Sequence, residues 1–447
     1  MNTTIETGHP LDDAIIGGNF TTPEMKTIWS SQNRLRQQFI VEKGLAKVEA
    51  ALGMIPASAG QAIQALTFDQ LSLANIQRVS SQSQHSLLGL IQNMQTEAGA
   101  SGEFVHYGAT TQDIVDTGMV LQIKSSISLM QKRLSNINQT LGQLSEKYKR
   151  TKIVAHTHGV QAVPSTYGFQ LIRYYDELTR QQKRLTQAED DVLVGNLADA
   201  VGSHSALGKD GIEVEKALME ELGLKRTPIA FHASPDRIVH YTSALTILSA
   251  QLGKMAKNFF HQAGNEVGEI SESYVGQVGS STMPHKQNPE QLEAVMALVE
   301  PVFQAQNLLQ HSLLSLGERD AVSWKMLWLA LPEIHQYVDR QLSLMEGLLP
   351  TLQAHLDRMA ENAEVMGDFL YSENLMMVLG KKLGKQTAHH IIHEAAMQAM
   401  AGGLDFISHI ANQEEVPYTV EELRMKINHE QVTEAIPVLI DEVLGGK

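Results

Sequence analysis

The sequence predicts an all-α protein, and three observations favour that fold class. Three stretches, 57–163, 236–283 and 351–416, contain no proline. Proline breaks helix interiors because it lacks an N–H donor and clashes with the preceding turn, so each stretch leaves room for helices longer than the usual ~11–12 residues. Short alternating segments joined by Asn-Gly or Asp-Gly turns, the pattern of strands, are scarce. The third observation is a long apolar repeat.

This repeat alternates spacings of three and four residues over three heptads, at Val120, Ile123, Ile127, Met130, Leu134, Ile137, Leu141 and Leu144. The residues between these positions are mostly Ser, Gln, Lys, Arg and Asn. The spacing predicts one long helix with a buried face and a solvated face. Such a seam needs a partner helix, either in a bundle or in an oligomer.

Other segments with helical spacing complete a predicted three-segment fold. Long helices are expected over about 166–194, 237–273, 290–316 and 331–349, and shorter ones over 24–53, 375–383 and 385–401. Because several long amphipathic helices bury one another's apolar faces, they predict a bundle. We expect an N-terminal helical domain at 1–109, a central long-helix bundle at 110–355 and a C-terminal helical domain at 356–447.

Composition excludes several functional classes. The 447 residues include 35 Lys and Arg against 50 Asp and Glu, which gives a formal charge of −15, and no cysteine. Without cysteine there is no disulfide, thiolate nucleophile or iron–sulfur cluster. The acidic balance argues against nucleic-acid binding. No apolar run reaches the ~18 residues of a spanning helix, and no signal peptide is evident, so a cytoplasmic protein with no membrane partner is expected.

The segment 276–289, GQVGSSTMPHKQNP, has the density of Gly, Ser and Pro that is typical of a loop. Within it Ser280, Ser281, His285, Lys286 and Asn288 supply hydroxyls, a cation and an amide. These groups suit the removal of a proton beside a carboxylate and the stabilisation of the resulting charge. The alternative interpretation is an ordinary turn before a helix.

Positions 279–289 match every fixed position of GSSxMPxKxNP, so the sequence resembles the fumarase/aspartase superfamily. Two further segments, HYGATTQD at 106–113 and THGVQAVP at 157–164, resemble that superfamily's other two motif regions in order and spacing. The similarity extends from about residue 20 to the C-terminal helices. Within the superfamily the chain is similar to the branch that contains adenylosuccinate lyase and 3-carboxy-cis,cis-muconate cycloisomerase.

The resemblance implies a homotetrameric lyase whose active sites are shared between subunits and which needs no cofactor and no metal. Ser280 would be the catalytic base, Lys286 and Asn288 would stabilise the aci-carboxylate intermediate, and His158 would be the general acid. The substrate, a small di- or tricarboxylate, would be bound by the remaining expected site residues, which are Thr110, Thr111, Gln112, Thr157, His85, Ser281, Met283, Arg319 and Lys325. His85 is followed by Ser86, where adenylosuccinate lyases have His-Asp.

Departures from the family pattern bear on the substrate. Adenylosuccinate lyases carry a phosphate-contacting Arg-Tyr where this chain has Asn19-Phe20. After Glu318-Arg-Asp they have a Ser and an Arg, again phosphate contacts, where this chain has Lys325 and Trp328. Bidentate arginine–phosphate contacts are strong, so this chain is expected to bind AMP poorly. The Trp324–Trp328 pair and Ala388-His-His resemble the cycloisomerase, whereas Thr157-His-Gly resembles adenylosuccinate lyase.

The leading hypothesis is therefore reversible β-elimination with C–N cleavage of a succinyl-type, N-substituted aspartate and release of fumarate. The alternatives are lactonising cycloisomerisation of 3-carboxy-cis,cis-muconate and, in another class, a catalytically silent structural relative. His389 and His393, an i,i+4 pair, raise a metal-dependent hydrolase as a distant third, but no HExxH order accompanies them.

Overall fold

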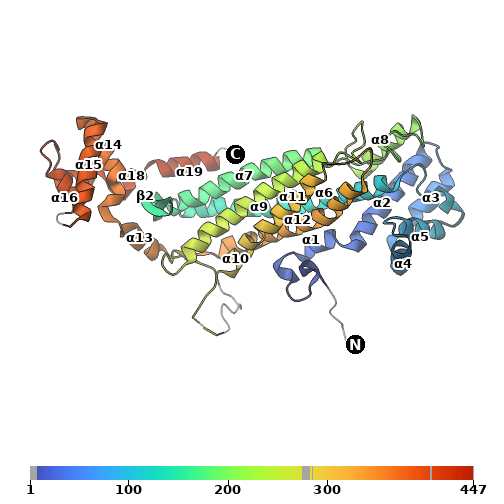
Figure 1. The fold of residues 1–447 in the computed structure, drawn as a ribbon, viewed down its shortest axis with the longest axis horizontal. Helices are drawn as coiled ribbons and strands as arrows, with labels where there is room; N and C mark the ends of the chain where they lie inside the picture. The colour runs from blue at the N-terminus through green and yellow to red at the C-terminus, as the bar shows by residue number, and fades with distance from the viewer. Residues whose placement is uncertain (1–7, 274–281, 284, 403–404, 446–447) are drawn as a thin grey trace. The chain divides into compact units, whose positions relative to one another are not determined.

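The computed structural model describes residues 8–273, 282–283, 285–402 and 405–445. Its described part is mostly helical (Figure 1), which confirms the all-α class. The N-terminal helices are α1 (Pro23–Ile28), α2 (Ser31–Ala51), α3 (Ala57–Ala65), α4 (Leu73–Ser83) and α5 (Leu88–Ala98). The following helices are α6 (Thr111–Lys147), α7 (Tyr167–Val192), α8 (Asp210–Leu222), α9 (Asp236–Ala263), α10 (Glu290–Ala297), α11 (Val299–His311) and α12 (Ala321–Leu348).

The C-terminal helices are shorter, as the sequence predicts. They are α13 (Leu356–Glu364), α14 (Ser372–Leu383), α15 (Lys385–Met400), α16 (Phe406–Ala411), α17 (Val420–Lys426), α18 (His429–Val432) and α19 (Ala435–Gly445). Apolar side chains from α14, α15, α16 and α17 form one buried cluster that includes Leu379, Ile391, Phe406 and Leu423. The apolar periodicity over 375–383 and 385–401 therefore faces this local core.

The predicted apolar seam is the buried face of α6. Its first seven positions, from Val120 to Leu141, are fully buried, and Leu144 is half-buried. Polar side chains of α6 reach neighbouring helices: Gln131 donates to Glu189 of α7, and the Arg133 Nε atom donates to Asp339 of α12 at 2.9 Å. The seam therefore packs within a bundle of long helices.

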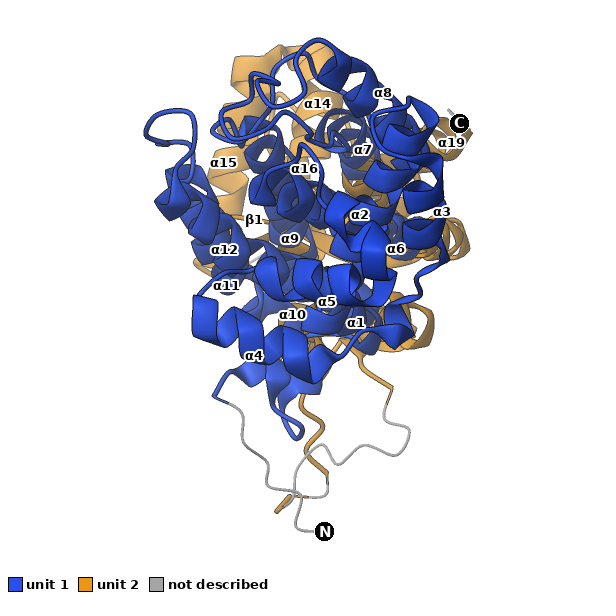
Figure 2. Ribbon diagram, turned by 90° about the vertical axis from the view of Figure 1, so that its right-hand side faces the viewer, with its two compact units in different colours: residues 1–135, 180–253, 294–344 blue, residues 136–179, 254–293, 345–447 orange. Residues whose placement is uncertain are grey.

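The chain forms two compact units, shown in different colours in Figure 2, and the boundaries between them fall within α6, α7, α9, α10 and α12. Unit 1 comprises residues 1–135, 180–253 and 294–344, and unit 2 comprises 136–179, 254–293 and 345–447. In unit 2, the amides of Gln170 and Gln262 bond reciprocally between α7 and α9. The division into three domains at residues 110 and 355 stays a prediction.

Two antiparallel strand pairs interrupt the helices. Strand β1 (Lys152–Thr157) pairs with β2 (Val160–Thr166), and β3 (Ile270–Ser271) pairs with β4 (Gln353–Ala354). The β1–β2 hairpin holds the Thr-His-Gly motif at its turn. Sequence periodicity did not reveal it, because its turn lacks the usual Asn-Gly or Asp-Gly pair.

Several predicted helix boundaries were wrong. The helix expected over 24–53 breaks at Ser30, whose hydroxyl accepts the N–H of Asn33 at 3.1 Å and so caps α2. The helix expected over 237–273 ends at Ala263, and that over 290–316 divides at Leu298. Helix α12 begins ten residues before the expected position 331 and contains Pro332, because packing outweighs the one backbone hydrogen bond that proline removes.

Glu49 of α2 makes stability depend on pH. It is 0% exposed, neither carboxyl oxygen has a hydrogen-bond partner in the described chain, and burial, with repulsion from Glu42, raises its pKa from 4.5 to about 9. The folded carboxyl thus keeps a proton that the unfolded chain releases, so stability falls as pH rises from about 4.5 towards 9.

Replacing Glu49 with glutamine is therefore expected to remove this pH dependence. The free energy of unfolding of E49Q, relative to wild type, increases by on the order of a few kcal/mol between pH 5 and pH 8. Denaturant unfolding at a fixed protein concentration measures it, with exposed Glu97→Gln as the matched control. An unchanged pH dependence in E49Q contradicts a protonated Glu49.

Candidate active site

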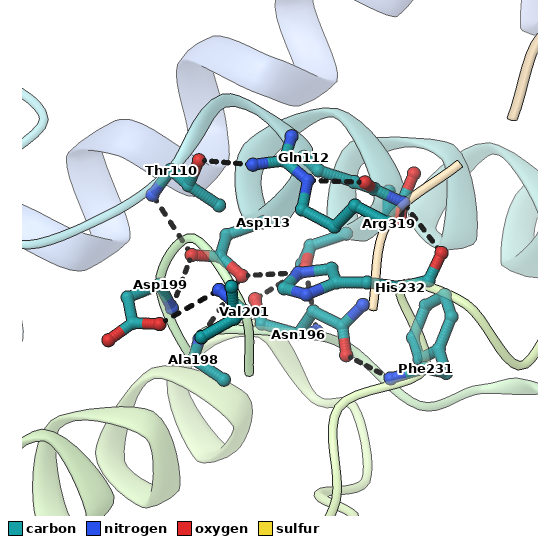
Figure 3. A network of polar contacts seen from close by, with 12 residues as sticks. Thr110, Gln112, Asp113, Asn196, Ala198, Asp199, Val201, Phe231, His232 and Arg319 are labelled. Atoms are coloured by element: carbon teal, nitrogen blue, oxygen red, sulfur yellow. Dashed lines mark hydrogen bonds and ion pairs between the residues drawn. The ribbon is translucent and has the colours of Figure 1, made fainter. Parts of the chain in front are cut away.

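In unit 1 the start of α6 gathers three of the expected substrate-binding residues. Arg319 donates from Nη1 to the Thr110 hydroxyl at 2.9 Å and from Nε to the Gln112 amide oxygen at 3.0 Å (Figure 3). Thr110 also donates its backbone N–H to Asp113 at 3.0 Å. The cation thereby bridges the loop before α12 to the first turn of α6, and their sequence separation exceeds 200 residues.

Beneath this turn lies a buried carboxylate that sequence reasoning missed. Asp113 accepts the backbone N–H groups of Ala198 and Asp199, each at 3.1 Å, and its Oδ1 lies 2.8 Å from Nε2 of His232 (Figure 3). Asp113 is 0% exposed. It stands inside the HYGATTQD motif, which was the one available signal. These bonds fix where Thr110 and Gln112 point.

A second buried carboxylate, Asp116, orients Gln112 and the tryptophan pair. It accepts from the Gln112 amide at 3.0 Å and from the Trp324 indole N–H at 2.6 Å. Burial raises its pKa to about 6, and nearby His232 opposes that rise. Trp324 in turn packs on Trp328, with 4.5 Å between ring centroids. The side chain of Lys325, between them on α12, is exposed and has no ion pair with another described residue.

His85 also lies beside this turn. Its Nδ1 accepts the backbone N–H of Leu88 at 3.0 Å at the start of α5, so the other ring nitrogen, Nε2, carries the proton. That Nε2 lies 3.3 Å from the Thr111 hydroxyl and can donate to it. The local bonds therefore hold the His85 ring next to the expected carboxylate-binding residues.

His106, four residues before Thr110, is a further candidate that the sequence analysis did not select. Its Nδ1 lies 2.7 Å from Glu42, a carboxylate that is 1% exposed. Burial opposes a charge on the ring, but the charge and hydrogen bond of Glu42, together with the charge of Asp113, outweigh it and raise the pKa of His106. Gly108 follows with φ +70°, and a Cβ there would lie 2.6 Å from the Leu207 side chain. These contacts restrain the segment 106–109 that leads to Thr110.

Unit 2 carries Thr157 and His158 at the tip of the β1–β2 hairpin. Thr157 pairs with Val160, so His158 and Gly159 alone form the turn, with φ values of 52° and 82°. Two positive φ angles are typical of a type I′ turn, in which a histidine carries backbone strain that asparagine or glycine would avoid. The His158 side chain is exposed and bonds to no other described residue. It therefore projects from a well-defined turn.

In the segment 276–289, Met283, Lys286 and Asn288 are among the described residues, whereas Ser280 and Ser281 lie outside them. Lys286 and Asn288 line a hollow of about 590 Å³ in unit 2, together with His355. His355 bonds through Nε2 to the Ser271 hydroxyl at 3.0 Å. The exposed Lys286 ammonium has no ion pair with a described residue, so its charge is available to a ligand.

The predicted residues thus fall into separate sets. Unit 1 holds Thr110, Thr111, Gln112, His85, Arg319 and Lys325, and unit 2 holds Thr157, His158, Met283, Lys286 and Asn288. Within the described part of unit 2, no hydrogen bond joins the hairpin tip to the Lys286 segment. His389 and His393 stack on α15 with 6.3 Å between centroids, and no described residue forms a cluster of three metal ligands with them.

The described chain is a bundle of long helices that carries three polar motif segments. Residues 13–303 match the family model described as "Lyase", and residues 368–443 match "Adenylosuccinate lyase C-terminus". The chain therefore belongs to the fumarase/aspartase superfamily and is a lyase. None of its described helices is long and apolar enough to cross a membrane.

Three relatives show the breadth of this similarity. The chain is 38% identical to an N-acetyl-S-(2-succino)cysteine lyase of Enterococcus italicus, over 98% of this chain and 97% of the relative. It is 32% identical to an adenylosuccinate lyase of Pyrococcus abyssi, over 92% of each chain. The solved 3-carboxy-cis,cis-muconate lactonizing enzyme of Pseudomonas putida superposes with a TM-score of 0.89, at 28% identity, over 97% of this chain and 98% of that one.

Proposed function

We propose that this lyase cleaves a succinyl thioether of the N-acetyl-S-(2-succino)cysteine class, and releases fumarate and the free thiol. The 38% identity along 98% of the chain to a lyase named for that compound carries the proposal. The sequence alone favours an amine as the leaving group. The adenylosuccinate lyase relative, at 32% identity, keeps C–N cleavage of an N-substituted aspartate as the second candidate.

The reaction is a β-elimination across two carbons of the succinyl group. Ser280, as its alkoxide, removes the proton from the carbon beside one carboxylate, and Lys286 and Asn288 stabilise the aci-carboxylate that results. The electron pair then forms the double bond of fumarate while the C–S bond breaks. The thiolate takes a proton, which His158 can supply. Serine is a weak base at neutral pH, so its alkoxide needs a stabilising cation, and Lys286 of the same segment would supply it.

The cluster around Arg319 supports a substrate without a phosphate. The Arg319 guanidinium is already bonded to Thr110 and Gln112, so it holds the carboxylate-binding turn together. Lys325 and Trp328 stand where adenylosuccinate lyases have phosphate-contacting residues, and Trp328 packs on Trp324. A short thiol needs no bidentate phosphate site, whereas AMP does.

The unpaired lysines support a polyanionic substrate despite the net charge of −15. Lys286 in unit 2 and Lys325 in unit 1 form no ion pair with a described residue, so the charge of each is available to a substrate carboxylate. A local cationic cleft would overcome the long-range repulsion that an acidic protein exerts on a dicarboxylate.

The test is the identity of the products. Purified protein is incubated with N-acetyl-S-(2-succino)cysteine while a thiol reagent and fumarate absorbance are followed together. We expect thiol and fumarate in a one-to-one ratio. No thiol from this compound, together with turnover of adenylosuccinate or lactonisation of 3-carboxy-cis,cis-muconate, would overturn the proposal in favour of the alternative that reacts.

We also propose that the protein is a homotetramer in which several chains complete each active site. Co-expression of the inactive variants Ser280→Ala and His158→Asn is expected to restore activity, because mixed oligomers contain sites with both residues intact. If the two residues of a site come from different chains, about a quarter of the sites in random mixtures are intact. Mixed oligomers with no recovered activity would show that both residues come from one chain.

A further inference from the structure

A cavity of about 200 Å³ lies in unit 1 between α2, α6 and α12, and Trp328 is the one lining residue that also entered the substrate argument above. Its lining is mainly apolar and aromatic, with a single cation. The lining residues are Trp29, Ser31, Arg34, Val115, Met119, Gln122, Leu327, Trp328 and Pro332. No acidic side chain is among them.

The cation of the cavity, Arg34, has no counter-charge. Its guanidinium makes no ion pair or hydrogen bond with another described residue. Arg34 is exposed, and the partial loss of water around its guanidinium lowers its pKa. Arg36 on the same helix differs, because it lies 3.7 Å from Asp69 and 4.5 Å from the centre of the Phe68 ring. An arginine that lines an apolar cavity without an acidic partner can form a charge-assisted pair with a bound anion.

The aromatic wall is held in place by bonds behind it. The Trp29 indole N–H donates to the Ser126 hydroxyl at 3.0 Å, and its ring lies 4.7 Å from the ring of His335. His335 is 0% exposed and bonds through Nε2 to the Tyr241 hydroxyl at 2.9 Å. The hydrogen bond to Ser126 and the ring contact with His335 both hold Trp29 in place. The cavity is therefore preformed, and its side chains need little ordering when a ligand binds.

We propose that this cavity is a second ligand site that binds a small organic carboxylate with an apolar body. The carboxylate pairs with Arg34, and the apolar body lies between Trp29 and Trp328 against Met119 and Leu327. A cavity of roughly 150 Å³ admits benzene, so about 200 Å³ suits a six-membered ring that carries one carboxylate. A dicarboxylate fits poorly, because the lining offers no second cation.

Intrinsic fluorescence reports on this cavity directly, since two of the three tryptophans line it and the third, Trp324, packs on Trp328. The probe is cyclohexanecarboxylate, which is transparent at tryptophan wavelengths. We expect a saturable change in emission with a Kd below about 1 mM. Fumarate at saturating concentration leaves the titration unchanged, and the neutral cyclohexylmethanol binds at least about tenfold more weakly.

Arg34→Gln is expected to raise the Kd at least about tenfold, whereas Arg34→Lys retains most of the affinity and the control Arg36→Gln binds as wild type. Val115→Phe, which fills the cavity but keeps the charge, also abolishes binding. Circular dichroism confirms folding of each variant. The proposal is overturned if wild type shows no saturable change, if Arg34→Gln binds unchanged, or if fumarate displaces the probe. None of these outcomes depends on thioether turnover.

Discussion

Alanine at Ser280 is expected to lower kcat for thiol release by about 10³-fold or more. Loss of a catalytic base that removes a carbon-bound proton costs at the upper part of the 10²–10⁴-fold range, because water is a poor substitute within a closed site. The substrate still binds through its carboxylates, so KM changes little. Steady-state kinetics with N-acetyl-S-(2-succino)cysteine measure both values, and size-exclusion chromatography checks that the variant elutes as wild type does.

Two neighbouring variants make the Ser280 result specific. Thr282→Ala changes an exposed hydroxyl in the same loop that has no assigned role and is expected to keep wild-type kcat. Ser281→Ala, at an expected substrate-binding residue, is expected to raise KM more than it lowers kcat. Wild-type turnover by Ser280→Ala would contradict the proposed mechanism, whichever substrate is used.

Asparagine at His158 is expected to lower kcat by about 10²-fold with the thioether and by more with an amine substrate. A cysteine-type thiol has a pKa near ~8.5 and leaves as an anion more readily than an amine does, so it depends less on a proton from His158. Asparagine tolerates the positive φ of the β1–β2 turn, which keeps the hairpin intact. Parallel kinetics on the thioether and on adenylosuccinate measure this difference.

The pH profile separates this chemical role from a structural one. Wild-type kcat is expected to fall at high pH with a step that His158→Asn lacks, since the variant has no ring proton to lose. His156→Asn, two residues away on β1, is the matched control and is expected to retain that step. An identical pH profile in wild type and His158→Asn would contradict the role of His158 as proton donor.

The helical fold could be predicted wherever one periodic signal dominated. The seam from Val120 to Leu141 predicts α6 correctly because all seven of its positions face the core. Helix ends were harder to predict. Ser30 caps α2 within a continuous apolar pattern, which hid the break, and Pro332 is accommodated inside α12 against the local rule for proline. The β1–β2 hairpin was not predicted, because His158 occupies the turn position where asparagine or aspartate is usual.

Only the site residues that belong to recognisable motifs could be predicted from the sequence. The motif resemblance selected Thr110 and Gln112, and Arg319 joins them in the structure. The pairs behind these residues could not be found from one sequence, because Asp113 meets His232 across 119 positions and Glu42 meets His106 across 64. Such contacts arise from the packing of helices and leave no local pattern.

The measurement that tests the central claim most directly compares kcat/KM for N-acetyl-S-(2-succino)cysteine and for adenylosuccinate on the same preparation. The missing phosphate-binding arginines and the thioether-cleaving relative predict a ratio of at least about 100 in favour of the thioether. A ratio below one, with adenylosuccinate the better substrate, would contradict the assignment of a thiol as the leaving group.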